Sequence, residues 1–362
     1  GGGDYLLGDK GRKGMRHQGR RGIKCGTRGL GIVFGVILIN SIYTNASFAQ
    51  KKEGAGISIY DNYYDVAAVS PQEAWVVGYE GKILHTADGG KNWESQKSNV
   101  EASLFNVSFK DNKNGFITGG DGIILLTQNG GQTWQQQSSG TKQHLLSACY
   151  ADPQNLWAAG ERGTIVHSPD GGNTWQDRSL KEDAILNKVY FFDNINGWIA
   201  GEFGKILHTS DAGQTWQLQG NLIGVPKDEM LTSYGYTIYL YDVRFMDLNR
   251  GWVTGAAGTI LYTEDGGQNW RKISTDVNQP LFSLGIAKEV LAIGSVGTVL
   301  STHTNPGNNQ WRLRKDIEVF NWLRGIDFCQ QDYGWIVGGR GTVLRSTNGG
   351  QQWEIIQKMI SI

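Results

Sequence analysis

The chain is poor in cysteine and proline, and neither sign of charge is in excess. Among its 362 residues are 3 Cys and 6 Pro, with 34 basic residues against 34 acidic ones. So few cysteines exclude a disulfide framework, and no window shows the 3.6-residue apolar periodicity of an amphipathic helix. Glycine and tryptophan are abundant instead, with 52 and 13 residues. This composition suits one large all-β domain better than several small domains.

The balance of charge hides an uneven distribution along the chain. Residues 1–50 hold 8 Lys/Arg and 2 Asp/Glu, so the remainder has 34 − 8 = 26 basic and 34 − 2 = 32 acidic residues, a net charge of −6. A net-acidic domain is a poor candidate for general nucleic-acid binding, because the phosphate backbone would repel it. We therefore expect no nucleic-acid partner.

Residues 1–49 are predicted to be a targeting segment that is removed. Basic residues precede a ten-residue apolar run, Leu30–Ile39, and Ser47 and Ala49 occupy the −3 and −1 positions of a cleavage site before Gln50. This is the three-part layout of a secretory-type signal. Ten apolar residues are too few to anchor a mature protein across a bilayer. Cys25 precedes the apolar run, so no lipoprotein box is present.

A short motif recurs seven times in the remaining chain. Its copies are DGGKNW, NGGQTW, DGGNTW, DAGQTW, DGGQNW, PGNNQW and NGGQQW, and the successive Trp residues are 41, 41, 41, 54, 41 and 42 positions apart. Each repeat also carries an alternating segment such as LFNVSF, an apolar stretch such as WVVG, and a Gly-x-x-Gly pair before a short apolar run such as GKIL. A period of this length indicates a repeat architecture.

The repeats predict an all-β fold, a seven-bladed β-propeller with four antiparallel strands per blade. A single blade cannot bury both of its faces, whereas stacking blades into a closed ring covers every face. The propeller should span residues 50–362, with an insertion at 221–240 and with blades near 57–100, 101–141, 142–182, 183–223, 237–277, 278–318 and 319–362. Whether residues 57–61 add an outer strand to blade seven stays open.

The recurrent motif looks like the Asp-box of sialidases and other propellers, where it is a folding element away from the active site. Gly allows a tight turn between the third and fourth strands, and Asp or Asn bonds back to local amides. We expect each motif Trp to be buried between blades, which would make Trp175→Ala cost about 3–5 kcal/mol. The structural residues are Asp88, Trp93, Trp134, Asp170, Trp175, Asp211, Trp216, Asp265, Trp270 and Trp353.

Other patterns resemble metal, phosphate or catalytic sites, but a structural role explains them better. His85, His167 and His208 occupy the same register in three blades, so rotation about the ring axis keeps them apart and no metal site is expected. The Gly-x-x-Gly pairs precede strands, whereas a phosphate loop needs a helix N-terminus. No pair of carboxylates is singled out for hydrolysis. Cys149 and Cys329, on first strands of blades three and seven, should be buried free thiols. We expect no cofactor.

Departures from the repeat point to a binding surface. The insertion at 221–240 joins blades four and five on the rim that carries the turns between strands two and three. The same rim carries Arg162 and Arg340, and the first strands bring Arg244 and Arg324 to the channel. Arginine suits bidentate recognition of carboxylates and peptide groups. These four arginines are the predicted partner-binding residues, in a lopsided patch and not a ring.

The seven repeats, the order WxxG–GxxG–DGGxxW and the cleavable signal resemble the photosystem II stability and assembly factor family of cyanobacteria and plastids, over Ile57 to Ile362. This resemblance implies a non-enzymatic, chaperone-like protein of the thylakoid lumen. It would be soluble or peripheral to the membrane, and would bind the newly made D1 reaction-centre protein and early assembly intermediates. We expect it to act as a monomer. Two alternatives stay open: an Asp-box glycoside hydrolase or sialidase-like enzyme, and a sortilin-like or carbohydrate-binding module.

Overall fold

A computed structural model of the protein describes residues 56–219, 222–223, 238–304 and 310–356. These residues belong to the compact unit that runs from Gly54 to Ile362. The predicted targeting segment, residues 1–49, lies outside the described residues, as does most of the predicted insertion.

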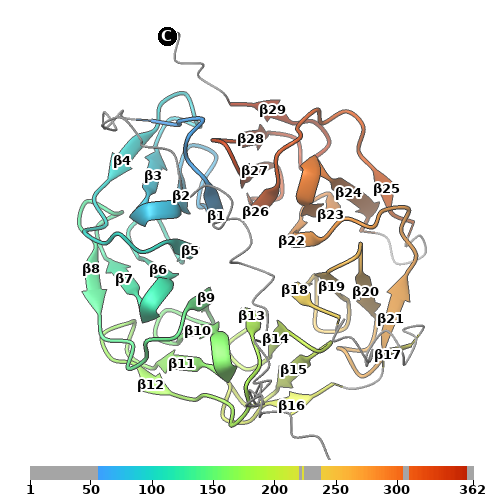
Figure 1. The fold of residues 1–362 in the computed structure, drawn as a ribbon, viewed down its shortest axis with the longest axis horizontal. Helices are drawn as coiled ribbons and strands as arrows, with labels where there is room; N and C mark the ends of the chain where they lie inside the picture. Colours follow the sequence, from blue (N-terminus) through green and yellow to red (C-terminus); the bar gives the residue numbers. More distant parts are fainter. Residues whose placement is uncertain (1–55, 220–221, 224–237, 305–309, 357–362) are drawn as a thin grey trace, which may run out of the picture. The chain divides into compact units, whose positions relative to one another are not determined.

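Seven sheets follow one another around a ring, and each contains four strands that pair in the order of the sequence. Figure 1 shows the ring down its axis, with the first strand of each sheet at the central channel. This confirms the predicted seven-bladed propeller. The channel strands are β1 (Tyr63–Ala68), β5 (Leu104–Phe109), β9 (Leu145–Tyr150), β13 (Leu186–Phe191), β18 (Leu240–Phe245), β22 (Leu281–Ile286) and β26 (Leu323–Cys329).

The second and third strands form the buried middle of each blade. Nearly every residue of the second strands is buried, because side chains alternate between two faces and each face meets another blade. The second strands are β2 (Ala74–Gly78), β6 (Gly115–Gly119), β10 (Leu156–Gly160), β14 (Gly197–Gly201), β19 (Gly251–Gly255), β23 (Glu289–Gly294) and β27 (Tyr333–Gly338). The third strands are β3 (Ile83–Thr86), β7 (Ile124–Thr127), β11 (Ile165–Ser168), β15 (Ile206–Thr209), β20 (Ile260–Thr263), β24 (Val299–His303) and β28 (Val343–Ser346).

The fourth strands are short and mostly exposed at the outside of the ring. They are β4 (Glu94–Gln96), β8 (Gln135–Gln137), β12 (Gln176–Asp177), β16 (Gln217–Leu218), β21 (Trp270–Ile273), β25 (Arg312–Leu313) and β29 (Glu354–Ile355). Blade five has a further outer strand that the sequence did not reveal. It is β17 (Leu222–Ile223), which pairs with β21 in parallel.

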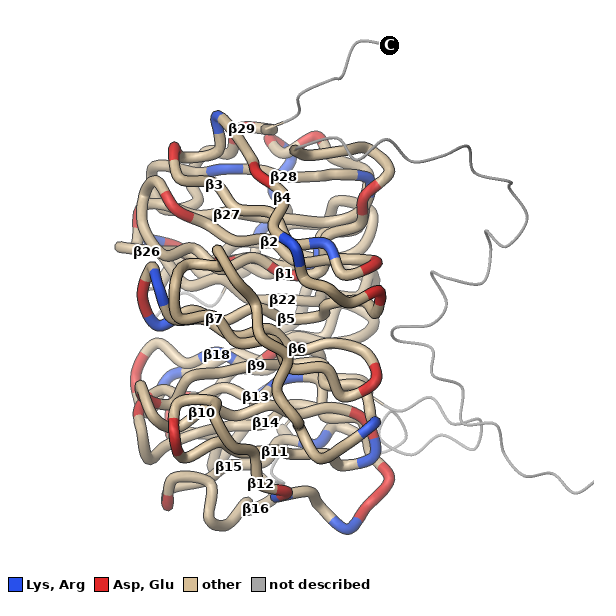
Figure 2. The backbone as a smooth tube through the Cα atoms, turned by 90° about the vertical axis from the view of Figure 1, so that its left-hand side faces the viewer, with Lys and Arg blue, Asp and Glu red and all other residues tan. Residues whose placement is uncertain are grey.

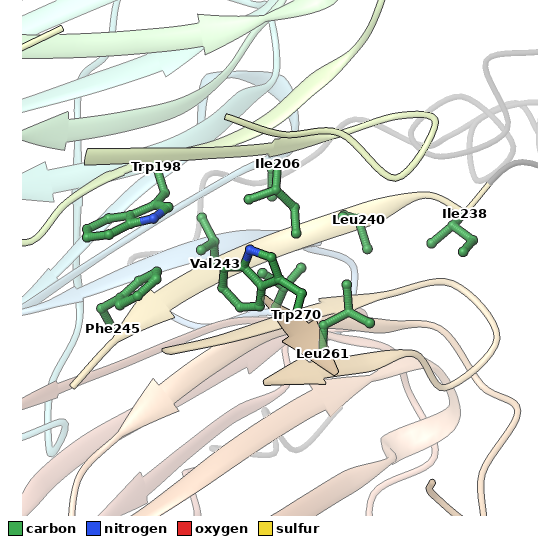
Figure 3. Packing of buried hydrophobic residues seen from close by; sticks show 10 residues of the cluster. Trp198, Ile206, Ile238, Leu240, Val243, Phe245, Leu261 and Trp270 are labelled. Carbon is green, nitrogen blue, oxygen red and sulfur yellow. The ribbon is translucent and has the colours of Figure 1, made fainter. Parts of the chain in front are cut away.

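Apolar side chains from neighbouring blades interlock in each space between sheets. Between blades four and five, Trp198 stacks on Phe245 with ring centroids 3.7 Å apart, and Trp270 meets the edge of the same Phe245 ring. Figure 3 shows this cluster, with Leu240 and Val243 of the channel strand filling the space beside the rings. The core is therefore a set of separate inter-blade clusters, each shared by two blades.

The predicted Asp-box loops join third and fourth strands and share one hydrogen-bond pattern. In blade one the Thr86 hydroxyl accepts the Gly90 N–H at 2.8 Å, and the Asp88 carboxylate accepts the Asn92 N–H at 2.9 Å. Blade four repeats both bonds, with Thr209 and Asp211 as acceptors. Polar side chains thus satisfy the loop amides in place of a sheet partner.

The prediction that every motif tryptophan is buried holds only in part. Trp93, Trp134 and Trp270 are buried as expected, but Trp175, Trp216 and Trp353 are only half-buried. The burial of these rings correlates with the length of the fourth strand. The buried rings belong to blades whose fourth strand has three or four residues, and the half-buried rings belong to blades whose fourth strand has two. A longer outer strand covers the ring edge that otherwise meets solvent.

The ring closes without strand exchange among the described residues. All strands of the first sheet come from residues 63–96, and all strands of the seventh from 323–355. Residues 57–61, which the sequence left undecided, form no strand. They lie over the blade-seven turn, where the Asp61 carbonyl accepts the Gly341 N–H at 2.8 Å. Asp327 of blade seven also accepts the Ala68 N–H of blade one at 2.9 Å.

Candidate partner-binding rim

One rim of the ring carries the seven turns between second and third strands together with the linkers that enter each channel strand. We call it the turn rim. Four of its turns contain the short elements η1 (Tyr79–Gly81), η2 (Gly120–Gly122), η3 (Glu161–Gly163) and η4 (Ser295–Gly297). With the ring seen from its side, Figure 2 shows charged residues at both rims.

All seven turns place a non-glycine residue at positive φ. These residues are Glu80, Asp121, Arg162, Phe203, Ala257, Val296 and Arg340, with φ between 51° and 58°. The glycine that follows each also has positive φ, as in the type I′ turns that suit β-hairpins. An L-residue in this conformation costs about 1–2 kcal/mol, so the ring holds seven outward side chains at some expense in stability.

Arg162 and Arg340 are exposed on this rim, at the tips of the blade-three and blade-seven turns. They are not brought together, because two blades separate them one way round the ring and three the other. A partner that contacts both would have to cross the channel mouth. The predicted lopsided patch therefore divides into two separate positions on the turn rim.

Arg324 lies at the channel mouth of the turn rim, as the second residue of β26. Its guanidinium sits over the Phe282 ring, 4.9 Å from the centroid. Burial lowers the pKa of Arg324, opposed by the charges of nearby Tyr241, Tyr64 and Asp65. Within the described residues no carboxylate lies within ion-pair distance of it. A half-buried arginine without such a partner is suited to accept an anion from another molecule.

Arg244 lies elsewhere in the channel than the sequence suggested. It is the fifth residue of β18 and pairs with Trp252 at the start of β19, so it is nearer the opposite rim. Its guanidinium lies 3.8 Å from the Asp242 carboxylate and over the Tyr190 ring. Burial alone would lower the pKa of Arg244, but Asp242 and Asp327 outweigh it and hold the pKa above its ordinary value. Its charge is already compensated inside the channel.

Most of the predicted insertion cannot be placed, because residues 220–221 and 224–237 lie outside the described residues. Of the rest, Leu222 and Ile223 form β17 at the outside of blade five. Ile238 is buried in the cluster between blades four and five. The described ends of the insertion thus serve packing, and its role in binding stays a prediction.

Sequence reasoning missed a group of aromatic rings at the same channel mouth. Tyr64 stacks on Trp322 at 5.9 Å and contacts Phe105 at 5.8 Å, while Tyr241 lies 5.4 Å from Phe282. All but Trp322 are second residues of channel strands, where a register shift occurs between the first and third residues. This bulge turns the second side chain away from the inter-blade core. The sequence signal that could have revealed this group is the aromatic residue at the second position of several first strands.

A belt of polar side chains inside the channel was missed as well. The third residue of most channel strands bonds to the next blade, so that Asp65 accepts the Val107 N–H at 3.0 Å and Asn106 accepts the Ala148 N–H at 2.6 Å. Burial raises the pKa of Asp65 from 3.8 to about 6, opposed by the positive charge of Lys188. The belt therefore joins neighbouring blades.

The three histidines considered as metal ligands pack inside their own blades. His85, His167 and His208 each stack on the second-strand Trp of their own blade, with centroids 4.1–4.7 Å apart. Burial lowers the pKa of all three imidazoles. Over the described part of the chain, no group of three or more His, Cys, Asp or Glu could hold a metal ion. Cys149 and Cys329 are free thiols there, one half-buried and the other buried.

No helix within the described ranges is long and apolar enough to cross a membrane.

Comparison with known proteins gives one family by sequence. The family described as "Photosynthesis system II assembly factor YCF48" matches residues 45–142, 132–235 and 229–314, which is more than half of the chain. A curated relative, the "Photosystem II assembly protein Ycf48" of Synechococcus sp. (strain JA-3-3Ab), is 32% identical over 76 residues. That match spans 20% of this chain and 22% of the relative, so the chain covers about a fifth of the curated relative's length.

Solved structures show the fold. A structure titled "YCF48 bound to D1 peptide" has a TM-score of 0.65 and 21% identity, covering 81% of this chain and 95% of that one. A xyloglucanase of glycoside hydrolase family GH74 from Xanthomonas campestris has a TM-score of 0.64 and 12% identity, covering 84% of this chain and 55% of the enzyme. Since structures this alike include an enzyme and an assembly factor, the fold does not choose between these functions.

Proposed function

Because the chain belongs to the photosystem II assembly factor YCF48 family, we propose that it assists photosystem II assembly by binding a segment of the D1 protein. A solved structure of similar fold is titled as YCF48 bound to a D1 peptide, which supports D1 as the partner. The proposal includes a non-enzymatic role, with binding energy used to hold the partner and no bond broken.

The observation that carries this proposal is Arg324 at the channel mouth. Its side chain is partly desolvated, lies over Phe282, and has no ion-paired carboxylate among the described residues. A peptide carboxylate or carbonyl that reached it would form a charge-assisted hydrogen bond, while an apolar side chain of the same peptide could rest on Tyr64 and Trp322. Arg162 and Arg340, exposed further out, would contact residues on either side of that anchor.

The location we propose is the thylakoid lumen, with the protein soluble or peripheral to the membrane and monomeric. The basic segment, the apolar run Leu30–Ile39 and the cleavage pattern before Gln50 support export across a membrane. N-terminal sequencing of the protein from its native source tests this, and a mature chain that retains residues 30–39 would contradict it.

Peptide binding tests the function directly. Synthetic peptides covering the lumen-exposed segments of D1 would be titrated against the full chain and against Arg324→Gln. We expect one peptide to bind and the variant to bind it at least about tenfold more weakly, since a hydrogen bond to a charged group contributes about 1.5–3 kcal/mol. Arg178→Gln, on an exposed arginine after the fourth strand of blade three, is the matched control and should bind normally.

A second pair of substitutions tests the outer arginines. Arg162→Glu combined with Arg340→Glu should weaken binding without lowering the melting temperature, and the loss should shrink as salt rises. If no D1 peptide binds the folded protein, the proposed function fails. If a peptide binds and Arg324→Gln binds it equally well, the function stands but the site lies elsewhere.

A further inference from the structure

The space between blades two and three departs from the repeat on the rim opposite the turn rim. We call this second rim the loop rim, because it carries the Asp-box loops and the loops that join first to second strands. In blade four the Asp-box residue Gly213 lies against the Trp157 indole of the preceding blade. In blade three the equivalent Gly172 lies against the smaller Leu126 side chain of the preceding blade.

Two residues that differ from the repeat explain this departure. The second strand of blade two has Phe116 where five other blades have Trp, and the sixth residue of the blade-three channel strand is Tyr150 where four other blades have Phe. Between blades three and four, Phe191 stacks on Trp157 at an interplanar angle of 22°, whereas the Phe116 and Tyr150 rings meet at 84°. A phenyl ring is shorter than an indole, so Phe116 leaves room near the loops that a Trp would fill.

A cavity of about 170 Å³ opens at this place, between the sheet of β5–β8 and the sheet of β9–β12 (Figure 1). Its walls combine apolar and polar side chains. Leu126, Tyr150 and Pro153 contribute apolar surface, and Gln128 and Gln154 contribute carboxamides. The volume corresponds to about six water molecules, which is enough for one sugar ring and too little for a drug-sized ligand.

Several polar groups of this cavity have no role in holding the fold together. Within the part of the chain that the structure describes, the carboxamides of Gln128 and Gln154 form no hydrogen bond, and neither does the Tyr150 hydroxyl. Burial and the nearby Asp111 carboxylate raise the pKa of Tyr150, so its hydroxyl stays neutral and can both donate and accept. A carboxamide also offers both a donor and an acceptor. The cavity therefore presents donors and acceptors side by side.

The charges at the cavity do not favour an ionic ligand. Lys110 lies in its wall, and the carboxylate of Asp111, the next residue in sequence, offsets that charge. The Asp170 carboxylate, also in the wall, already accepts hydrogen bonds from the Ser168 hydroxyl and the Thr174 N–H of its own loop. An uncharged ligand with several hydroxyl groups fits this wall, because each hydroxyl can donate and accept.

We propose that this cavity binds one uncharged sugar ring. The ring hydroxyls pair with the carboxamides of Gln128 and Gln154 and with the Tyr150 hydroxyl, and the C–H groups of the ring pack on the apolar part of the wall. The inference goes beyond D1 binding, because it concerns a small ligand on the loop rim, opposite the rim that carries Arg324.

The test titrates the methyl glycosides of glucose, galactose and mannose against the full chain, with binding followed by saturation-transfer NMR. Tyr150→Phe installs the residue of four other blades and removes only the hydroxyl, and Gln154→Ala removes one carboxamide. The matched control is Asn249→Ala, on the equivalent loop of blade five. Gln154 and Asn249 are both exposed, and their backbone carbonyls accept an Asp-box glycine N–H at 2.8 and 2.9 Å.

We expect at least one glycoside to bind, each cavity variant to bind it about fivefold more weakly, and the control to stay within about twofold of the wild type, since each cavity variant loses one hydrogen bond between neutral groups. Melting temperatures check that every variant is folded. Failure of all three glycosides to bind the wild type would overturn the proposal, as would equal binding by the wild type and both cavity variants. So would displacement of the glycoside by acetate, because the cavity would then select an anion. The D1 peptide titration with Arg324→Gln probes the other rim, so either proposal can fail alone.

Discussion

The third residue of most channel strands connects its blade to the next. Asp65 is the clearest case, because its carboxylate accepts the Val107 N–H and contacts the Asn106 amide while facing the charges of Lys188 and Asp327. Burial makes ionisation at this place unfavourable and raises the pKa of Asp65 to about 6. The folded state therefore binds a proton more readily than the unfolded state.

This linkage predicts how stability depends on pH. Between about pH 4 and 6 the unfolded chain has lost the Asp65 proton while the folded chain still holds it, so the free energy of unfolding falls as pH rises through that window. In Asp65→Asn the fall should be smaller by on the order of 2 kcal/mol across the window. The raised pKa of Asp327 acts in the same direction and leaves a residual slope.

The measurement is chemical denaturation followed by tryptophan fluorescence at several pH values. Below pH 4 both proteins should lose stability on further acidification, because hydrogen bonds to the Asp-box carboxylates hold pKa values low, as for Asp211 at about 2. Wild-type and Asp65→Asn curves that run parallel between pH 4 and 6 would contradict the assignment.

The sequence could not predict which side chains lie on which face of a channel strand. Alternation in a run such as LFNVSF assigns every second residue to one face, but the bulge between the first and third residues shifts the pattern. Phe105 therefore points to the channel mouth, and Asn106 to the next blade. The same shift explains why Arg324 lies at the mouth while Arg244, three residues further along its own strand, lies deep inside.

Among the elements, the second strand contributes more to the core than the Asp-box loop does. Strand position was predictable because seven aligned repeats showed the same order of apolar runs and turns. The relative burial of the two tryptophans in each repeat was not, because it depends on how many residues of the fourth strand cover the outer ring. Trp198 of β14 is 1% exposed between Phe245 and His208, whereas Trp175 is half-buried.

We expect Trp198→Ala to destabilise the protein by about 3–5 kcal/mol, as for a fully buried large side chain. Trp175→Ala should cost less, about 1–3 kcal/mol, because part of its ring already meets solvent and its Nε1–H bonds only the Gly172 carbonyl of its own loop. Urea denaturation of the two variants side by side measures the difference. Equal losses would mean that the loop tryptophan is packed as tightly as the strand tryptophan.

For the whole molecule, the repeat foretold the number of blades but not how the ring is fastened. Elsewhere in the ring the second glycine of a turn lies against the linker to the next blade, as Gly81 does against the Val100 carbonyl and Gly258 against Val277. At the junction of blades seven and one, Gly341 lies against the Ser58 carbonyl in the same way. The segment before β1 therefore supplies the linker that blade seven lacks, which no local sequence pattern could show.

This arrangement predicts different effects for two chemically identical substitutions. Gly341 and Gly140 both have positive φ, at 68° and 76°, so alanine brings the same backbone strain of about 1 kcal/mol at each. A Cβ at Gly341 would stand 2.3 Å from the Ser58 carbonyl oxygen, whereas nothing lies within 4 Å of one at Gly140. We expect Gly341→Ala to cost roughly 2–4 kcal/mol in total and to speed hydrogen exchange in residues 56–62, because the linker must move away from the turn. Gly140→Ala should lower stability by the strain alone and leave that exchange unchanged. If the two variants lose the same stability and exchange alike, the contact of residues 58–61 with blade seven does not close the ring.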